Sequence, residues 1–412
     1  MIPRWGREYS TRDALKALRT GWLNGPASGT PWGELWPEAD VFPVRSGREG
    51  LCLILQALRM PRGARVGVPL FCCRFLFEAV IAAGHHPIFL DINLENYLLD
   101  LESLHRHRRS LAAVVAVHPF GYPEDLDAVR QCLGPGPAVI EDFAAGLLSE
   151  YHGRPLGSIA PLAFGSFGIH KPATPGGGGL VVVNDRARSA AVQELWRGLP
   201  EPSRWNQALH VARCWTRSQA YRPSVYSFMM ATPWARRRDS AGGDPAEDAK
   251  RAATGRWRVE RMRDVDAALL PQRLSREREA ARWRCALAAI VRERGATSEA
   301  FIPADPVWGS WNYAMLPVRF PNRQERDQVR ARLRACGVDS HKMWEDCPTA
   351  ARHFGYNQGC PNAEQAAATV CTLPLHAQLT RADAECIGDA LGKCTDSKSR
   401  NACKNESHVP AR

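Results

Sequence analysis

Apolar runs recur along the first half of the chain at spacings typical of alternating strands and helices. The first four runs are separated by helix-like or mixed stretches of a dozen residues or more, the alternation of a mostly parallel sheet covered on both faces. Two further runs follow them. The six runs are ARVGVPL, HPIFLDI, LAAVVAVH, GPAVIED, LAFGSFG and GLVVVND. This pattern predicts an α/β fold with one large sheet.

The last two runs differ from the others in their connection. About ten residues, rich in Pro and Gly, separate LAFGSFG from GLVVVND. A right-handed crossover helix between parallel strands needs a longer connection. We therefore expect these two strands to form a tight antiparallel pair within the large sheet.

The second half of the chain predicts a smaller α+β domain. A long helix is expected from Arg256 onward with an interruption at Pro271, followed by a strand in YAMLPVRF, a helix that ends at Gly337, and a last helix capped by Thr380 and Asp383. We predict three regions from this pattern. The first is a large domain over 1–250, within which the stretch 187–250 is atypical and partly flexible. The second is a small C-terminal domain over 251–392, and the third is a disordered tail over 393–412.

Composition and charge narrow the class of protein. Of 412 residues, 45% are apolar and 24% charged, as in ordinary globular chains, and no run has the roughly 18 apolar residues of a membrane span. The formal charge of +11 raises the possibility of nucleic-acid binding, but the arginines are dispersed and no groove-reading motif is present. The chain also begins without an apolar secretory segment. We expect a cytoplasmic protein that binds neither nucleic acid nor membrane, with a positive field suited to a small anionic substrate.

The thirteen cysteines are the next candidates for chemistry. They are scattered, and no pair has the CxxC spacing of a zinc site or a redox dithiol. We interpret them as reduced thiols that mostly fill the core, and we expect no metal.

Candidate site residues fall where the predicted strands end. Asp142 closes GPAVIED, and Ser166 and Lys171 lie at or just after the end of LAFGSFG. Ligands bind at the carboxyl ends of such strands, so these side chains should share a crevice. Ser46 and Gly47 precede an amphipathic helix, whose amino end attracts a phosphate. An amine, a carboxylate and a phosphate cradle together indicate pyridoxal 5'-phosphate (PLP), although a lysine beside a glycine-rich turn can also be a plain loop residue.

The chain resembles the PLP-dependent aminotransferases of the DegT/StrS type from about residue 43 to 391, with a poor match over 187–255. This resemblance implies a fold-type-I enzyme with a seven-stranded-type sheet. It also implies a homodimer that transfers an amino group from an amino acid to a keto-sugar, possibly linked to a nucleotide. The matching pieces are SGREGL, VPLF, AGHHPIFLDI, VHPFGYPEDLDA, VIEDFA, SFGIHK, GGGGLVVVND, RMRDVDAALLPQRL and TLPLHAQLT.

The resemblance also implies roles for individual residues. Lys171 would bind the cofactor aldehyde covalently and then move the proton of the substrate. Asp142 would hold the pyridine nitrogen in its protonated form. Ser166, together with Gly47 and Arg48, would bind the phosphate. We expect His170 to be structural and His118 to form hydrogen bonds at a strand end.

Several positions depart from the family pattern close to the expected cofactor. Ala145 stands where a polar Gln or His is usual. Cys73 stands where an aromatic ring usually stacks on the cofactor, and either Phe71 or Phe75 is a possible substitute. Gly177 replaces the glutamate of the family's GEGG motif.

A further departure concerns the residue that reaches the cofactor of the neighbouring subunit. Val259 replaces the asparagine that usually precedes the RM pair, with Arg256 or Arg258 as possible replacements. These changes leave two alternatives to amino transfer open. One is another PLP reaction, dehydration or a lyase step, on a similar substrate, and the other is a non-catalytic protein that keeps the fold for binding or regulation.

Overall fold

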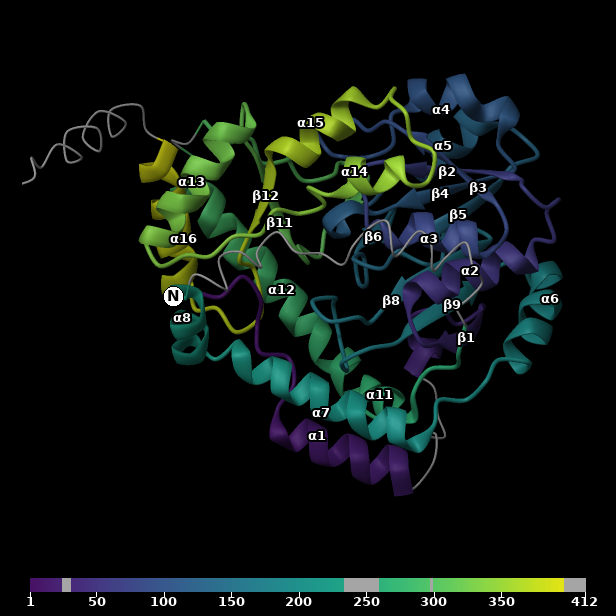
Figure 1. The fold of residues 1–412 in the computed structure, drawn as a ribbon, viewed down its shortest axis with the longest axis horizontal. Coiled ribbons are helices and arrows are strands. Elements are labelled where there is room, and N and C mark those ends of the chain that lie inside the picture. The colour runs from purple at the N-terminus through teal and green to yellow at the C-terminus, as the bar shows by residue number, and fades with distance from the viewer. Residues whose placement is uncertain (24–30, 233–258, 297–298, 396–412) are drawn as a thin grey trace, which may run out of the picture.

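The computed structural model describes residues 1–23, 31–232, 259–296 and 299–395, and it contains one large sheet and a smaller C-terminal part (Figure 1). The large sheet has seven strands in the order β1-β9-β8-β5-β4-β2-β3. Strand β9 runs antiparallel to both of its neighbours, and all other neighbouring pairs are parallel. The predicted α/β fold with a mostly parallel sheet is therefore confirmed. The strands are β1 (Asp40–Val44), β2 (Arg65–Pro69), β3 (His86–Leu90), β4 (Ala113–Val117), β5 (Ala138–Asp142), β8 (Leu162–Ser166) and β9 (Gly179–Val183).

Each of the six predicted runs contains one strand of this sheet. Strands β8 and β9 form the expected antiparallel pair, with Ser166 opposite Gly179 at its end. The sequence did not predict β1, which pairs with β9 at the edge of the sheet. Pro43 lies within β1, and a proline argues against a central strand because it donates no ladder hydrogen bond. An edge strand tolerates it.

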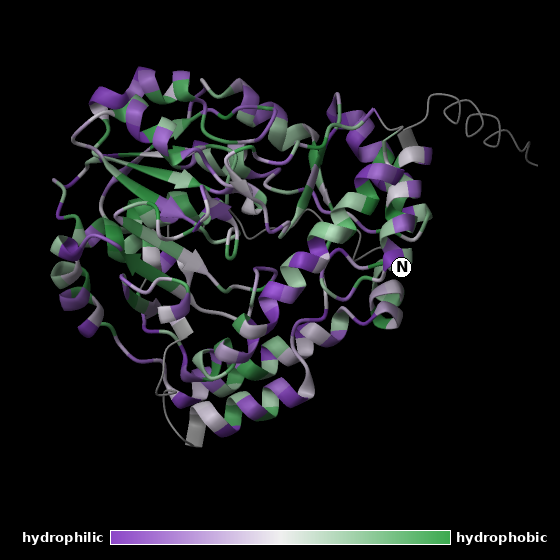
Figure 2. Cartoon of the chain, turned by 180° about the vertical axis from the view of Figure 1, so that it is seen from behind, coloured by the Kyte–Doolittle hydropathy of each residue, from purple (hydrophilic) through white to green (hydrophobic). Residues whose placement is uncertain are grey.

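Alternate side chains of the strands pack against helices on opposite faces of the sheet. In β4, Val115 lies in the same buried cluster as Leu53 of α2, whereas Val114 lies in a second cluster with Leu104 of α4. Both faces are apolar, as the green strands in Figure 2 show. The helices on the first face include α2 (Gly47–Ala57), α3 (Phe75–Ala82) and α6 (Arg186–Arg197), and those on the second include α4 (Leu101–His107) and α5 (Leu126–Leu133).

The C-terminal part is built on a second, two-stranded antiparallel sheet. Strand β11 (Leu316–Arg319) pairs with β12 (Val370–Leu373), and helices lie around them (Figure 1). The long helix predicted after Arg256 is divided into two, and Pro271 lies in the first turn of the second, where a proline costs no hydrogen bond. The helices are α11 (Asp264–Ala267), α12 (Leu270–Arg294), α13 (Arg323–Ala335), α14 (Cys347–Arg352), α15 (Pro361–Thr369) and α16 (Arg381–Thr395).

The structure describes part of the atypical stretch 187–250 and the beginning of the predicted tail. Residues 187–232 of the atypical stretch form the remainder of α6, α7 (Arg204–Ala220) and α8 (Pro223–Ala231), and residues 233–250 lie outside the described residues. Helix α16 continues to Thr395, and Lys393 in its last turn supplies a cation that favours the helix end. Residues 396–412 are outside the described part, and the domain boundaries stay a prediction.

The described residues were searched for paired cysteines, metal-binding clusters and membrane-spanning helices. The cysteines whose side chains the structure describes are unpaired. Within the same described ranges, no group of three or more His, Cys, Asp or Glu side chains is arranged to hold a metal ion. Among the described helices, none combines the length and the apolar character needed to span a membrane.

Glu124, a buried carboxylate in the loop after β4, predicts a pH effect on stability. It accepts hydrogen bonds from the N–H groups of Leu99 (2.9 Å) and Asp125 (3.2 Å), and burial raises its pKa to about 8. The folded chain keeps a proton here that the unfolded chain loses near pH 4.5, so stability contributed by this group is lost as the pH rises from about 5 to 8. Glu124→Gln should remove that loss. Urea unfolding should show the variant gaining on the wild type over this range, by up to about 1.4 kcal/mol per pH unit. A difference that is the same at pH 5 and pH 8 would contradict this.

Candidate active site

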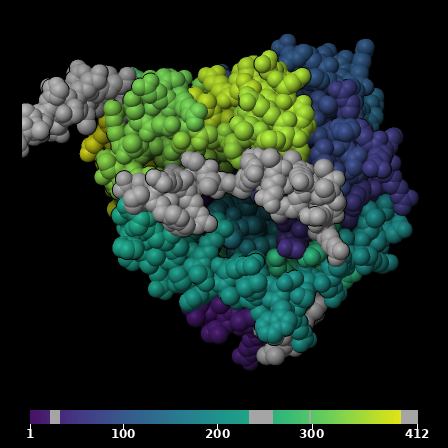
Figure 3. Space-filling model, viewed as in Figure 1, coloured from purple at the N-terminus to yellow at the C-terminus, as the bar shows by residue number. Residues whose placement is uncertain are grey.

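A cavity of about 540 Å³ lies at the carboxyl ends of the large sheet's strands. Loops that follow β2, β4, β5 and β8 line it, together with the start of α2 and one side of α7. Figure 3 shows this face hollowed between the teal segment that includes α7 and the green-to-yellow C-terminal part. All seven predicted site residues line this cavity, namely Gly47, Arg48, Cys73, Asp142, Ala145, Ser166 and Lys171.

Lys171 lies in the loop that connects β8 to β9. Its backbone N–H donates to the carbonyl of Gly168 (3.0 Å), and its half-buried side chain lines the cavity and two adjoining ones. The antiparallel connection places this loop at the same edge of the sheet as the end of β5. The amine is therefore available to a ligand and is not packed in the core.

Asp142 is the last residue of β5, and its side chain faces the cavity. The Oδ1 atom accepts a hydrogen bond from the N–H of Ala144 (2.8 Å). Burial raises the pKa of this carboxyl, while the Ala144 hydrogen bond and then the charge of Lys171 act in the opposite direction. A cationic ligand group beside Asp142 would add to these opposing effects and favour the carboxylate.

Glu141, the neighbour of Asp142, points to the opposite side of the strand and is structural. Its two oxygens accept hydrogen bonds from the backbone N–H groups of residues 157, 159 and 160. The Nε2 atom of His118 lies 3.2 Å from Glu141 Oε1, and His118 Nδ1 accepts from the N–H of Glu124 (2.8 Å). An accepting Nδ1 leaves Nε2 as the donor, so a neutral His118 satisfies both bonds. The expectation that His118 forms hydrogen bonds at a strand end is confirmed.

The start of α2 lies tightly against the end of β8. Ser46 caps the helix by accepting from the N–H of Glu49 (3.4 Å), and Gly47 is its first residue. A Cβ atom at Gly47 would lie 2.9 Å from Ser166 Cβ and 3.1 Å from the carbonyl oxygen of Gly165, which is too close. Ser166 Oγ accepts from the N–H of Gly168 (3.2 Å). The helix start and the Ser166 hydroxyl thus meet at one wall of the cavity.

Arg48 lines the same wall but has partners of its own. Its Nη1 atom lies 3.6 Å from Glu78 Oε2, and its guanidinium stacks over the Phe75 ring at 4.8 Å from the centroid. The side chain is about one-third exposed. A phosphate role for Arg48 stays a prediction.

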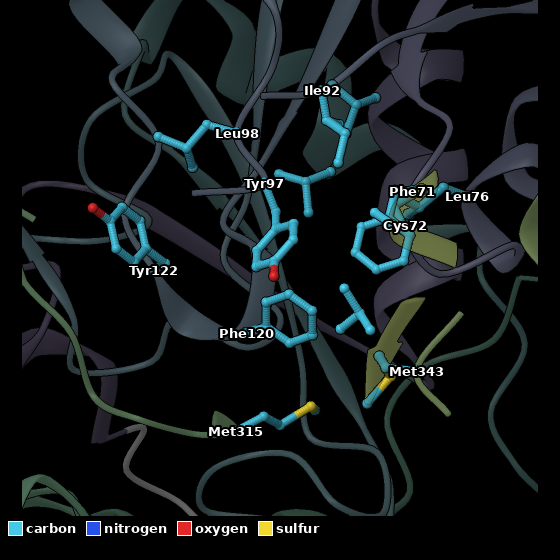
Figure 4. Close-up of a cluster of buried hydrophobic side chains, with 14 of the residues drawn as sticks. Phe71, Cys72, Leu76, Ile92, Tyr97, Leu98, Phe120, Tyr122, Met315 and Met343 are labelled. Atoms are coloured by element: carbon cyan, nitrogen blue, oxygen red, sulfur yellow. The ribbon is translucent and has the colours of Figure 1, made fainter. Parts of the chain in front are cut away.

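The aromatic side chains near Cys73 differ from the two that the sequence suggested. Phe71 is 1% exposed and packs with Tyr97 and Phe120 in the core (Figure 4), so it does not line the cavity. Phe75 does line it, beside Cys73. Trp344, from the C-terminal part, also lines it, which the sequence did not predict. The suggestion that Phe71 replaces the missing ring was wrong, because that ring is held by its core neighbours.

Three other positions, Ala145, Gly177 and Val259, also depart from the family pattern. The carbonyl of Ala145 accepts a hydrogen bond from Asn312 Nδ2 (2.8 Å). A Cβ atom at Gly177 would lie 3.0 Å from Asp266 Oδ2 and 3.2 Å from His210 Cε1, so these two side chains occupy the adjoining space. Val259 lies within the described residues. Arg256 and Arg258, the possible replacements for the family's asparagine, lie outside them.

Besides Trp344, three polar cavity residues were missed from the sequence. His210 and Arg217 come from α7, and Arg263 comes from the segment before α11. His210 Nε2 lies 2.9 Å from Asp266 Oδ1, and Arg263 Nη1 lies 3.5 Å from Asp266 Oδ2. His210 and Arg217 fall in the stretch that matches the family poorly, whereas Arg263 lies within the matching piece RMRDVDAALLPQRL and was not singled out there.

The sheet order, the single antiparallel strand β9 and the cavity at the carboxyl ends of the strands are those of the fold-type-I transferase architecture. A model of the DegT/DnrJ/EryC1/StrS aminotransferase family matches residues 36–210 and 249–392, and the chain belongs to this family. The Streptococcus pneumoniae protein Spr1654 in its PLP form has the same fold. Its TM-score is 0.74 at 18% identity, over 96% of this chain and 98% of that one.

Two relatives show how far the sequence similarity extends. The GDP-perosamine synthase of Vibrio cholerae is 31% identical over 174 residues, which are 40% of this chain and 47% of that protein. This match spans less than half of the relative. The dTDP-4-dehydro-2,3,6-trideoxy-D-glucose 4-aminotransferase of Saccharopolyspora spinosa is 24% identical over 367 residues, 87% of this chain and 85% of that protein.

Proposed function

We propose that the chain is a PLP-dependent aminotransferase that transfers an amino group from an amino acid to a keto-sugar linked to a nucleotide. The observation that carries the proposal is the position of Lys171 and Asp142 in one cavity, at the ends of the adjacent strands β8 and β5. Family membership and the nucleotide-sugar substrates in the relatives' names support it. The PLP form of Spr1654 supports the cofactor.

The residues of the cavity fit PLP. Lys171 offers a primary amine for the aldehyde, and the buried carboxylate of Asp142 suits a protonated ring nitrogen. The start of α2 and Ser166 offer backbone and hydroxyl donors to a phosphate, and Gly47, which has no Cβ, lets the helix start lie close to Ser166. Ala145 contributes no polar side chain to this set.

The chain's own groups would perform the chemistry in a definite order. When bound, PLP serves as an electron sink for the bond between the substrate Cα and its hydrogen. Lys171 would hold the cofactor through its aldehyde carbon, and its freed Nζ would accept the proton from the substrate Cα and return it to that cofactor carbon. Asp142 would hold the proton on the ring nitrogen through an ion pair.

The space next to the cavity suits a substrate larger than an amino acid. A second cavity of about 840 Å³ adjoins the first, and the two share Cys73, Phe75, Ile169, Lys171 and Trp344. Its walls carry cationic side chains, among them Arg74 and Lys342, beside acidic ones. We propose that the sugar enters from this side. A homodimer and a cytoplasmic location stay predictions.

The unusual residue Cys73 predicts a trade between cofactor affinity and turnover. Burial raises the pKa of this thiol, so it is a neutral, half-buried group in the wall shared by both cavities. A stacked ring contributes roughly 0.5–1.5 kcal/mol beyond its burial. We expect Cys73→Phe to tighten PLP by up to about tenfold, since about 1.4 kcal/mol is tenfold, and to slow turnover of the native substrate. Titration of cofactor-free wild type and variant with PLP measures this. Unchanged affinity and turnover would place Cys73 away from the ring.

A half-reaction tests the proposed function. PLP-loaded protein is mixed with L-glutamate in the absence of any sugar, and 2-oxoglutarate is quantified. An aminotransferase should release about one equivalent per site and leave the cofactor in its amine form. A lyase or dehydratase would release no 2-oxoglutarate in proportion to sites, and a non-catalytic protein would leave the cofactor unchanged. The experiment is repeated with a series of other amino-acid donors. If none of them yields its keto acid in proportion to the sites, the proposal is contradicted.

A further inference from the structure

The backbone on either side of Lys171 has an unusual conformation. His170 has φ of 71° and Ala173 has φ of 54°, both in the left-handed region although neither is glycine. Such residues are unfavourable by themselves and persist only where the surroundings hold them, often at functional sites. The contacts that hold these two residues therefore decide where Lys171 is placed.

Two carboxylates from distant parts of the chain bind the N–H groups of these two residues. The His170 N–H donates to Glu8 Oε2 (3.2 Å), and the Ala173 N–H donates to Glu277 Oε2 (2.9 Å). Glu277 belongs to α12 and is fixed by an ion pair with Arg284 (2.7 Å). Glu8 belongs to the N-terminal segment. Lys171 thus lies between two backbone groups that are each bound by an acid.

The side chain of His170 is held as well. Its ring stacks on Trp5 with centroids 4.5 Å apart and an interplanar angle of 15°, and it makes a T-shaped contact with the Tyr221 ring, whose centroid is 5.5 Å away. The Nε2 atom lies 3.2 Å from Arg217 Nη2. The N-terminal segment therefore holds both the backbone and the ring of the residue before Lys171.

The same segment is anchored at a distance from the loop. The Ile2 N–H donates to the carbonyl of Gly337 (2.7 Å), the Asp339 N–H donates to the carbonyl of Ile2 (3.1 Å), and the Arg7 N–H donates to Gln378 Oε1 (2.7 Å). These partners belong to the C-terminal part. The segment is a fixed connection between that part and the lysine loop.

We propose that Glu8 is a positioning residue for Lys171: by accepting the His170 N–H it fixes the backbone from which the lysine reaches the cavity. Trp5 assists it through the His170 ring. The importance of this placement rests on the proposed function, in which Lys171 binds the cofactor.

Hydrogen exchange in the cofactor-free, full-length protein tests the proposal without any reaction. Glu8→Ala removes the acceptor, and we expect amide exchange over residues 167–174 to become at least about tenfold faster while β4 is unchanged. Added PLP should then attach to Lys171 about tenfold more slowly than in the wild type. Glu8→Gln keeps an acceptor oxygen and should stay within about threefold of the wild type in both measurements. Glu38→Ala, an exposed acid near the same end of the chain, is the matched control and should change neither.

Three outcomes would overturn the proposal. They are exchange over 167–174 that is unchanged in Glu8→Ala, exchange that rises equally in β4, and Glu8→Gln as impaired as Glu8→Ala. If Glu8→Ala does not fold, Trp5→Leu removes the ring under His170, and the same local rise is expected; its absence would also overturn the proposal. Failure of PLP to attach to the wild-type protein would refute the proposed function and leave the exchange result to decide the role of Glu8.

Discussion

Replacing Lys171 by alanine should abolish covalent attachment of PLP and leave the fold intact. The side chain is half-buried at the wall of a cavity, so its removal creates no void in the core. Wild-type protein treated with PLP and borohydride should gain the mass of one reduced cofactor, located on the peptide that contains Lys171. Lys171→Ala should gain nothing at that peptide.

A matched lysine makes this experiment specific. Lys342 lines the adjoining cavity and is paired with Asp327 (3.3 Å) and Glu345 (3.4 Å). Lys342→Ala should keep full labelling on Lys171. Circular dichroism should show the same unfolding midpoint for Lys171→Ala and the wild type within a few degrees. A reduced cofactor on the Lys171→Ala protein would show that another amine is the attachment site.

Asp142→Asn should bind PLP but slow the half-reaction with glutamate by at least about a hundredfold. An amide cannot form an ion pair with the protonated ring nitrogen, so the ring loses much of its capacity to accept electrons. Single-turnover release of 2-oxoglutarate measures the rate, and the visible absorbance of the bound cofactor measures occupancy. Asp127→Asn changes an exposed aspartate and should keep the wild-type rate. Equal rates in Asp142→Asn and the wild type would refute the role of this carboxylate.

The positions of the site residues were predictable because they depend on local patterns. Alternating apolar runs locate β5 and β8, and parallel strands bring their carboxyl ends to one edge, so Asp142, Ser166 and Lys171 meet there. Gly47 was predictable from the helix start that follows it. Each of these inferences uses only neighbouring residues and the general geometry of α/β sheets.

The rest depends on contacts between distant segments. Trp344 reaches the cavity from the C-terminal part, and Glu8 reaches the lysine loop from the other end of the chain. No periodicity marks either residue, because its position is set by tertiary packing. Phe71 was misplaced for the same reason, since its proximity in sequence to Cys73 does not reveal that it points into the core.

Transfer of a labelled amino group tests the central claim most directly. The PLP-loaded protein is incubated with ¹⁵N-glutamate and a nucleotide-linked keto-sugar, beginning with the dTDP-linked substrate named for the Saccharopolyspora spinosa relative and extending to GDP- and UDP-linked ones. Mass spectrometry of the sugar product should show ¹⁵N in the amino sugar, with one 2-oxoglutarate formed for each, and no product with Lys171→Ala. A wild-type protein that binds PLP and reacts with glutamate, yet labels none of these sugars, would contradict the assignment of a nucleotide-linked keto-sugar as its substrate.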